Sequence, residues 1–266
     1  MRHKQGRYAS DLTDQQWVRV KALLPLERSG PGRPLELDMR EVVNSILYVV
    51  RTGCQWEYLP KDYPNYHSVY YHYRKWCLDG TWRRLNETVR QQERQRCGRN
   101  AQPSAAILDS QSTKTTEAGG VRGYDAGKKV NGRKRHILVD TLGNLLEVVV
   151  HAADIQDRDG AKFVFNKLSL LVVASLLKVW ADGGYRGQLI NWLSDHFAIA
   201  LEIVQPPSDA HSFQVLPRRW VVERTLAWMG KYRRLSKDYE SCTLSSEGVV
   251  YIASIHTMLR RLDAPT

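Results

Sequence analysis

Residues 105–109 read Ala-Ala-Ile-Leu-Asp, and residues 176–182 read Leu-Leu-Lys-Val-Trp-Ala-Asp. Each is a short apolar run that ends in an aspartate, which is typical of a buried β-strand that reaches the edge of a sheet. The end of a strand leaves a side chain little freedom, so Asp109 and Asp182 stand where a preorganised site would need them. The two runs therefore predict a sheet with a functional site at its edge.

The residues between and after these runs predict the rest of an α/β domain, because β-rich segments alternate with segments of helical periodicity. The expected elements are a hairpin over 135–140 and 145–150, helices over 159–168 and 188–196, a strand over 199–204, a loop over 206–217, and helices over 218–234 and 247–262. This order favours a mixed sheet flanked by helices.

The first hundred residues show helical patterns only. A capping box formed by Thr13 and Gln16 predicts that a helix begins at Asp14. The expected helices cover 14–24, about 39–52 after an Asp38 cap and before Gly53, 69–78 after a Ser68 cap, and 82–96, with a loop over 29–34. The polar stretch 90–103 is expected to be a linker. The pattern predicts a helix-turn-helix-like domain over 1–100 and an α/β domain over 104–266.

The charge of the chain points to a polyanionic partner. Its 266 residues carry 39 Lys and Arg against 28 Asp and Glu, a net charge of +11. The first hundred residues hold 18 of these basic residues and 11 of the acidic ones. Nucleic acid is the usual partner of such a chain. The most apolar run, 170–177, is too short to cross a membrane, and no secretory signal is present, so an intracellular protein is expected.

Cysteine and histidine spacing argues against a zinc site. The four cysteines include no Cys-x-x-Cys pair, and the eight histidines form no zinc-enzyme motif. Any metal should therefore be bound by oxygen atoms. Buried free thiols are the expected state of the cysteines.

Three acidic residues are the candidates for such a site. Asp109 and Asp182 are joined by Glu223, which lies in an aromatic-rich helical segment. Three carboxylates around two Mg²⁺ ions about 3.5–4 Å apart would suit in-line phosphoryl transfer. Pairing of Glu223 with Arg219 or Arg224 is the alternative. Four other aspartates are explained by turn and cap positions and rank lower: Asp140, Asp154, Asp157 and Asp159.

Basic residues cluster beside these acids and on one N-terminal helix, where they suit phosphate contacts. Solvated surface charge is the alternative for the clusters, and a helical core is the alternative for the aromatic residues around Tyr73 and Trp76. The candidate DNA contacts are Arg33, Tyr70, Tyr71, Arg74, Lys75, Lys128, Lys129, Arg133, Lys134, Arg219, Lys231, Arg233 and Arg234.

Three ordered motifs make the chain similar to a known family. They are Ile-Leu-Asp-Ser-Gln-Ser-Thr-Lys at 107–114, Ala-Asp-Gly-Gly-Tyr-Arg-Gly at 181–187, and Arg-Trp-Val-Val-Glu-Arg-Thr-Leu-Ala-Trp at 219–228, which is followed by Tyr-Arg-Arg-Leu at 232–235. With these motifs, and with N-terminal segments such as 69–76, the chain resembles a DDE transposase of bacterial insertion sequences, of the insertion-sequence-five type.

The resemblance implies a ribonuclease-H-like core in which Asp109, Asp182 and Glu223 bind two Mg²⁺ ions, with Mn²⁺ as a substitute. It implies that the enzyme cuts double-stranded DNA at the ends of its element, leaves a 3′-hydroxyl and joins that hydroxyl to target DNA. Two ends must be joined, so a homodimer or larger assembly on DNA is expected, in the bacterial cytoplasm at the nucleoid. Arg219 matches the family's arginine four residues before the glutamate.

The chain departs from the family pattern at two positions. The family has tyrosine seven residues before the glutamate and lysine seven residues after it, whereas this chain has Leu216 and Gly230 there. Lys231 follows one residue later, about 100° further around a helix. Two other functions explain part of the sequence: a metal-dependent DNA nuclease on the same core, and a DNA-binding regulator without catalytic activity.

Overall fold

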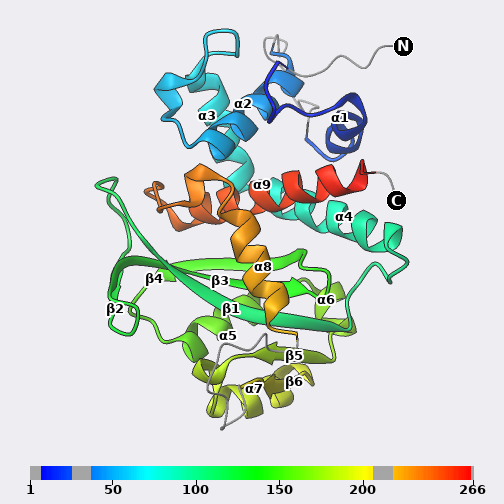
Figure 1. Cartoon of the computed structure of the whole chain (residues 1–266), viewed down its shortest axis with the longest axis vertical. Helices are drawn as coiled ribbons and strands as arrows, with labels where there is room; N and C mark the ends of the chain where they lie inside the picture. Colours follow the sequence, from blue (N-terminus) through cyan, green and yellow to red (C-terminus); the bar gives the residue numbers. More distant parts are fainter. Residues whose placement is uncertain (1–6, 26–36, 206–217, 265–266) are drawn as a thin grey trace.

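A computed structural model describes residues 7–25, 37–205 and 218–264 of the chain (Figure 1). The N-terminal helices are α1 (Asp14–Lys21), α2 (Met39–Thr52), α3 (Tyr66–Leu78) and α4 (Thr81–Arg96), with a short 3-10 helix η1 (Trp56–Tyr58) between α2 and α3. The Thr13–Gln16 capping box is confirmed, and α2 begins after Asp38 and ends at Gly53 as predicted. Gly53 has φ +75°, and a Cβ there would lie 2.9 Å from the Cβ of Arg233. The expected loop over 29–34 lies outside the described residues.

Two N-terminal predictions need correction. Helix α3 begins three residues earlier than predicted, because the side chain of Asn65, rather than Ser68, accepts a hydrogen bond from the first turn. The helix predicted over 82–96 is confirmed by α4, so only residues 97–103 of the stretch 90–103 are left as a linker. Arg94 is buried on this helix, where it forms an ion pair of 2.8 Å with Asp140. The polar composition of this stretch suggested an exposed linker, but an arginine that pairs with a buried carboxylate, as Arg94 does, can itself be buried in the protein.

The sheet contains β1 (Ala105–Lys114), β2 (Gly123–Asp125), β3 (Val130–Asp140), β4 (Leu145–Ala152), β5 (Lys178–Ala181) and β6 (Ala200–Ile203). The order along the sheet is β2-β3-β1-β5-β6, and β4 also pairs with β3. Strands β3 and β4 form the predicted antiparallel hairpin, whereas β1, β5 and β6 run parallel. The mixed sheet and its preceding helices confirm the expected α/β class.

The remaining helices are α5 (Asp157–Lys167), α6 (Leu170–Ser175), α7 (Gln188–Phe197), α8 (Trp220–Met229) and α9 (Thr243–Leu262), with 3-10 turns η2 (Gly183–Tyr185) and η3 (Arg233–Leu235). Helix α6 and strand β2 were not predicted. The helix predicted over 218–234 ends at Met229, and the chain then turns into η3. The loop predicted over 206–217 lies outside the described residues.

Side-chain alternation along the strands divides the interior into two cores. Ile107 of β1 and Ile137 of β3 belong to a core shared with α8, α9 and the N-terminal helices. Their neighbours Leu108 and Leu138 belong to a second core with α5, α6 and α7. Figure 1 shows α8 crossing the face of the sheet that carries Ile107 and Ile137, with α9 above the upper end of α8. The N-terminal helices therefore share a core with one face of the sheet, and the domain boundary at residues 100–104 stays a prediction.

Among the described residues, no helix is both long enough and apolar enough to cross a bilayer.

Candidate active site

Asp109 lies within β1 rather than at its end as predicted, because pairing with β3 continues the strand to Lys114. It lies on the face of the sheet that α8 crosses. Strand side chains alternate between faces, so Asp109 points to the same side as Ile107, two residues earlier. Its carboxylate accepts a hydrogen bond of 2.7 Å from the backbone amide of Ser110. Burial, and next the nearby negative charge of Asp182, raise the pKa of Asp109 to about 6, although Arg219 and Lys128 favour the charged form. Asp109 is therefore a desolvated carboxylate beside a second acid.

Asp182 follows the last residue of β5 directly. Strands β1 and β5 pair in parallel, with Ile107 opposite Trp180, and the same register continued by two residues brings Asp109 level with Asp182. The Asp182 side chain also accepts a hydrogen bond of 2.8 Å from the amide of Gly184, which fixes it at the start of η2. The carboxyl ends of parallel strands are the usual place for ligand sites in α/β sheets.

Glu223 reaches this edge from α8, where its side chain is half-exposed. Arg219, one turn earlier on the same helix, connects the two acids: its guanidinium lies 3.6 Å from Glu223 and 3.8 Å from Asp182. Of the two arginines considered as partners of Glu223, Arg219 is thus the one that contacts it. Arg224 instead stacks between Trp220 and Trp228 and donates to the carbonyl of Leu142.

The three carboxylates have the donor chemistry of a magnesium site, because Mg²⁺ prefers oxygen ligands. Within the described ranges, however, no three acidic, histidine or cysteine side chains lie close enough together to hold a metal ion. Arg219 lies between Asp182 and Glu223, as an ion would have to do. The residues fit a divalent cation in chemistry and charge, and the negative charge of Asp182 is close enough to raise the pKa of Asp109.

Asp157 is a fourth acid at this edge of the sheet, although the sequence alone ranked it below the three candidate acids. A Cβ placed on Gly184 would lie 3.1 Å from an oxygen of Asp182 and 3.3 Å from an oxygen of Asp157, so both carboxylates border the same glycine. Asp157 forms an ion pair of 2.9 Å with Lys134 and accepts a hydrogen bond of 3.0 Å from Ser110. The sequence explained Asp157 by a turn or cap role, but the N-cap residue of α5 is Gln156 and no side chain caps the helix. The contacts of Asp157 are instead with Lys134 and Ser110.

Lys134 sets the charge of this fourth acid. Burial opposes the charge of Asp157, but the hydrogen bond and the positive charge of Lys134 keep its pKa below the ordinary value. His136 is itself buried against His151, with ring nitrogens 2.8 Å apart. Burial and the neighbouring His151 lower the pKa of His136 to about 3, so this ring is neutral. Asp157 is therefore held as an ionised carboxylate by a single buried lysine.

The candidate DNA contacts divide by exposure. Tyr71, Arg74 and Lys75 are exposed on α3, whereas Tyr70 is half-buried and packs edge-on against Trp56. The other exposed candidates are Lys128, Lys129, Lys231 and Arg233. Lys128 also donates to the carbonyl of Ser110 at 3.1 Å, which places its charge next to Asp109.

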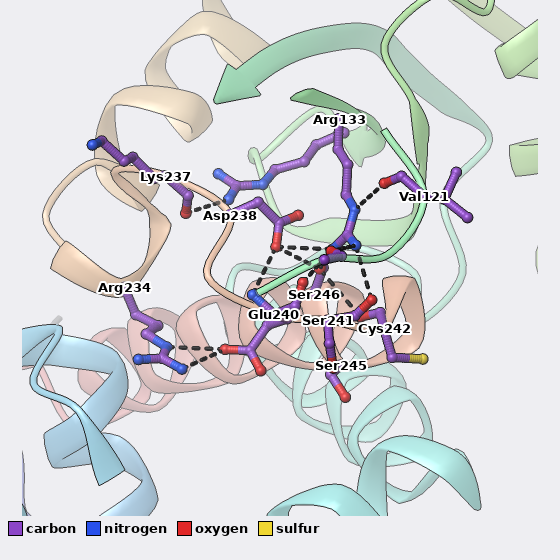
Figure 2. Close-up of polar contacts among 12 residues, drawn as sticks. Val121, Arg133, Arg234, Lys237, Asp238, Glu240, Ser241, Cys242, Ser245 and Ser246 are labelled. Carbon is purple, nitrogen blue, oxygen red and sulfur yellow. Dashed lines mark hydrogen bonds and ion pairs between the residues drawn. The ribbon is translucent and has the colours of Figure 1, made fainter. Parts of the chain in front are cut away.

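Three candidates are buried and hold the protein together instead. Arg133 pairs with Asp238 at 3.2 Å, and Arg234 pairs with Glu240 at 2.8 Å, as Figure 2 shows. Lys134 contacts Asp157, as described above. Because these cations have internal partners and little exposed surface, they are not candidates for direct phosphate contacts, and the prediction for them is corrected. Arg33 lies outside the described residues.

The fold and the site define a class of protein. A mixed α/β sheet carries one acid within β1 and another directly after β5, and basic helices precede it. This arrangement suits an enzyme that cleaves a polyanionic strand. Comparison with known proteins identifies the family. Residues 100–256 match the family described as "Transposase DDE domain", and residues 12–86 match the family described as "Putative transposase of IS4/5 family".

A curated relative agrees with these matches. The chain is 30% identical over 114 residues to the "Insertion element IS402 uncharacterized 16.2 kDa protein" of Burkholderia cepacia, which covers 41% of this chain and 76% of that protein. The chain belongs to the DDE transposase family, and its sheet is the ribonuclease-H-like fold of that family. It is a nucleic-acid-cleaving enzyme of a family that binds DNA and generally uses divalent metals.

Proposed function

We propose that the chain is the transposase of its own insertion element: it binds the terminal inverted repeats, cleaves at the element ends and joins the 3′-hydroxyl to target DNA. One observation carries the proposal. Asp109 and Asp182 lie level on neighbouring parallel strands, and Arg219 links Asp182 to Glu223. By its resemblance to the family, the chain would use these acids as its strand-cleaving site.

Asp109, Asp182 and Glu223 would hold two Mg²⁺ ions, or Mn²⁺ in their place. When bound, such ions stabilise the negative charge that develops on phosphate oxygens during in-line displacement. Side chains of the protein surround this site with further positive charge. Lys128 and Arg219 are close enough to influence the charge of Asp109, and both would bind non-bridging phosphate oxygens of the DNA strand.

The chemistry takes place in two displacements. In the first, a water oxygen forms a new bond to phosphorus, the P–O3′ bond breaks, and the 3′-oxygen leaves with a proton. In the second, that 3′-hydroxyl oxygen attacks a phosphate of target DNA, and the P–O3′ bond of the target breaks. The same acids can serve both steps, because each step forms one P–O bond to an attacking oxygen in line with the P–O3′ bond that breaks: the first is a hydrolysis and the second a transesterification.

Residues 1–100 would contribute DNA-end recognition, and residues 104–266 would contribute catalysis. Arg74 and Lys75 on the exposed side of α3 suit phosphate contacts. At least two copies would assemble on DNA, because two ends must be joined to one target. A transposase of a bacterial element would work in the cytoplasm at the nucleoid.

A strand-transfer assay tests the proposal. The full chain is incubated with Mg²⁺, duplexes that carry the terminal repeats flanking its gene, and a plasmid target. We expect joined products from the wild type, and no cleavage from Asp109→Asn, Asp182→Asn or Glu223→Gln, with DNA affinity within a few-fold of the wild type. Asp195→Asn, at an exposed position on α7, is the matched control and should remain active.

The outcomes separate the three functions. Nicking without joining would favour a nuclease, and binding without nicking would favour a regulator; either result overturns the proposal. Cleavage by one of the three acid variants would remove that residue from the site. Charge removal at Arg74 and Lys75 should weaken binding and flatten its salt dependence, and an unchanged salt slope would show that α3 does not face phosphates.

A further inference from the structure

A strongly basic cavity lies where α2, α8 and α9 meet, away from the carboxylates. Its volume is about 360 Å³. Four of its lining residues are cations and none is an acid; the lining residues are Arg51, Trp228, Lys231, Tyr232, Thr257, Arg260 and Arg261. A cavity with this lining suits an anion.

The positive charge of the cavity has no counter-ion among the residues that the structure describes. None of its four cations forms an ion pair there, and Arg261 donates a hydrogen bond of 2.9 Å to the neutral side chain of Asn144. The nearest acids are already engaged: Asp140 pairs with Arg94 at 2.8 Å, and Glu93 pairs with Arg96 at 2.9 Å. This contrasts with the buried arginines of Figure 2, each of which has a carboxylate partner.

The positive charge of the cavity affects the pKa values of two neighbouring side chains. Burial, followed by repulsion from Arg260 and Arg51, lowers the pKa of His256 to about 3. Burial raises the pKa of Tyr232, and the arginines of the cavity oppose that change. Two separate side chains therefore respond to cations that converge on one place.

Aromatic rings hold these cations in position without neutralising them. The guanidinium of Arg261 lies 4.0 Å from the ring centre of Trp228, and that of Arg51 lies 5.1 Å from the ring centre of Tyr232. The hydroxyl of Tyr232 is 3.0 Å from that of Thr257, so hydroxyl groups also border the space. Stacking of this kind orients an arginine while its N–H donors stay available for a ligand.

The cavity lies at one end of α8, and the acids lie at the other. Lys231 follows Glu223 by eight residues, of which the first six lie in α8 before it ends at Met229. The helical part and the turn after it together span on the order of 10 Å. Neighbouring nucleotides of a strand are about 3.4 Å apart along the duplex axis, so this separation corresponds to about three nucleotide steps.

We propose that this cavity binds one backbone phosphate of DNA, about three nucleotides from the bond that is cut at the carboxylates. The inference rests on the proposed function and assigns new residues to DNA binding: Arg51, Arg260 and Arg261 join Lys231. Several cations around one phosphate give a strong contact that is independent of base sequence. The site fixes the position of the strand along α8.

The test measures binding of the full chain to a labelled duplex of the element end over a range of salt concentrations. The variant is Lys231→Gln with Arg260→Gln, because both side chains are exposed. Loss of one phosphate contact should lower the slope of log affinity against log salt by about 0.9. We expect affinity at moderate salt to fall roughly ten-fold, and Lys231→Arg with Arg260→Lys to retain it. Lys162→Gln, on the opposite face of the sheet, is the control and should match the wild type.

Single methylphosphonate substitutions then locate the contact. The wild type should lose affinity when the phosphate about three nucleotides from the cleaved bond is neutralised, and the double variant should lose no more there. An equal further loss in the double variant at every position would overturn the inference. So would unchanged DNA binding together with altered self-association, which would assign the cavity to a second copy. Failure of the wild type to bind DNA would instead refute the proposed function.

Discussion

Replacement of Arg133 by methionine should destabilise the protein without removing a DNA contact. Methionine keeps much of the side-chain volume but removes every donor of the guanidinium. In the structure those donors contact Asp238 at 3.2 Å, the carbonyl of Glu240 at 2.6 Å and the hydroxyl of Ser246 at 3.0 Å. Asp238 and Glu240 lie in the segment between η3 and α9, and Ser246 lies in the first turn of α9, so Arg133 ties β3 to both (Figure 2).

The cost follows from burial. Both side chains of the Arg133–Asp238 pair are at most 1% exposed, so the substitution leaves a buried carboxylate without its counter-ion. Breaking such a pair costs about 3–5 kcal/mol. For a protein of this size, 1 kcal/mol shifts Tm by about 2–4 °C, so we expect Arg133→Met to lower Tm by about 6–20 °C.

Thermal unfolding, combined with a double-mutant cycle, measures this effect. Asp238→Asn should cost less than Arg133→Met, because the amide keeps the shape and Arg133 still donates to the carbonyl of Glu240 and the hydroxyl of Ser246. Adding Asp238→Asn to Arg133→Met should recover part of the loss, since it removes the unpaired charge. The reasoning fails if Arg133→Met melts within about 2 °C of the wild type. It also fails if the folded variant binds DNA with a reduced salt slope, which would return Arg133 to the DNA contacts.

Two further predictions concern the site and the interior. Gly184→Ala should reduce strand cleavage roughly ten-fold with DNA binding unchanged, because its Cβ crowds the carboxylates of Asp157 and Asp182; Gly127→Ala, whose nearest contact would be an ordinary 3.5 Å, should cleave normally. The pKa of His256 is lowered to about 3, so its contribution to stability is present above the unfolded pKa of about 6.5 and is lost as pH falls. Between pH 6.5 and about 5 the unfolding free energy of the wild type should fall by about 2 kcal/mol through this group. In His256→Gln the unfolding free energy should depend less steeply on pH. Equal slopes in the two proteins would contradict the assignment.

Local sequence signals predicted the parts of the fold that local physics controls. The Thr13 capping box and the Asp38 and Gly53 caps depend on hydrogen bonds within a few residues, and each was found where predicted. The apolar runs that end at Asp109 and Asp182 gave the two parallel strands for a similar reason. Register was not predictable from either run alone, since it depends on pairing between segments 73 residues apart in the chain.

Charge patterns predicted less, because formal charge does not report burial. Arg133, Lys134 and Arg135 follow one another, and a strand exposes neighbours to opposite faces, so a half-exposed strand would have left one of them in solvent. All three are buried because both faces of β3 are covered. Their partners lie far away in the sequence, as Asp238 does for Arg133. An arginine-rich stretch was therefore assigned to DNA when it belonged to the interior.

The distribution of charge also explains why the acidic edge can act on an anion. Asp109, Asp182 and Glu223 have two cations near them. The ammonium of Lys128 lies beside Asp109. The contacts of Arg219, at 3.6 and 3.8 Å, are longer than a good charge-assisted hydrogen bond. The edge thus keeps an excess of negative charge that would repel a phosphate unless further positive charge joined it. The cations elsewhere on α3, and in the cavity beside Arg260, attract the strand at a distance from that excess. DNA would be held by α3 and by the basic cavity, and it would be cut at the acids. Helix α8 connects the cavity to the acids.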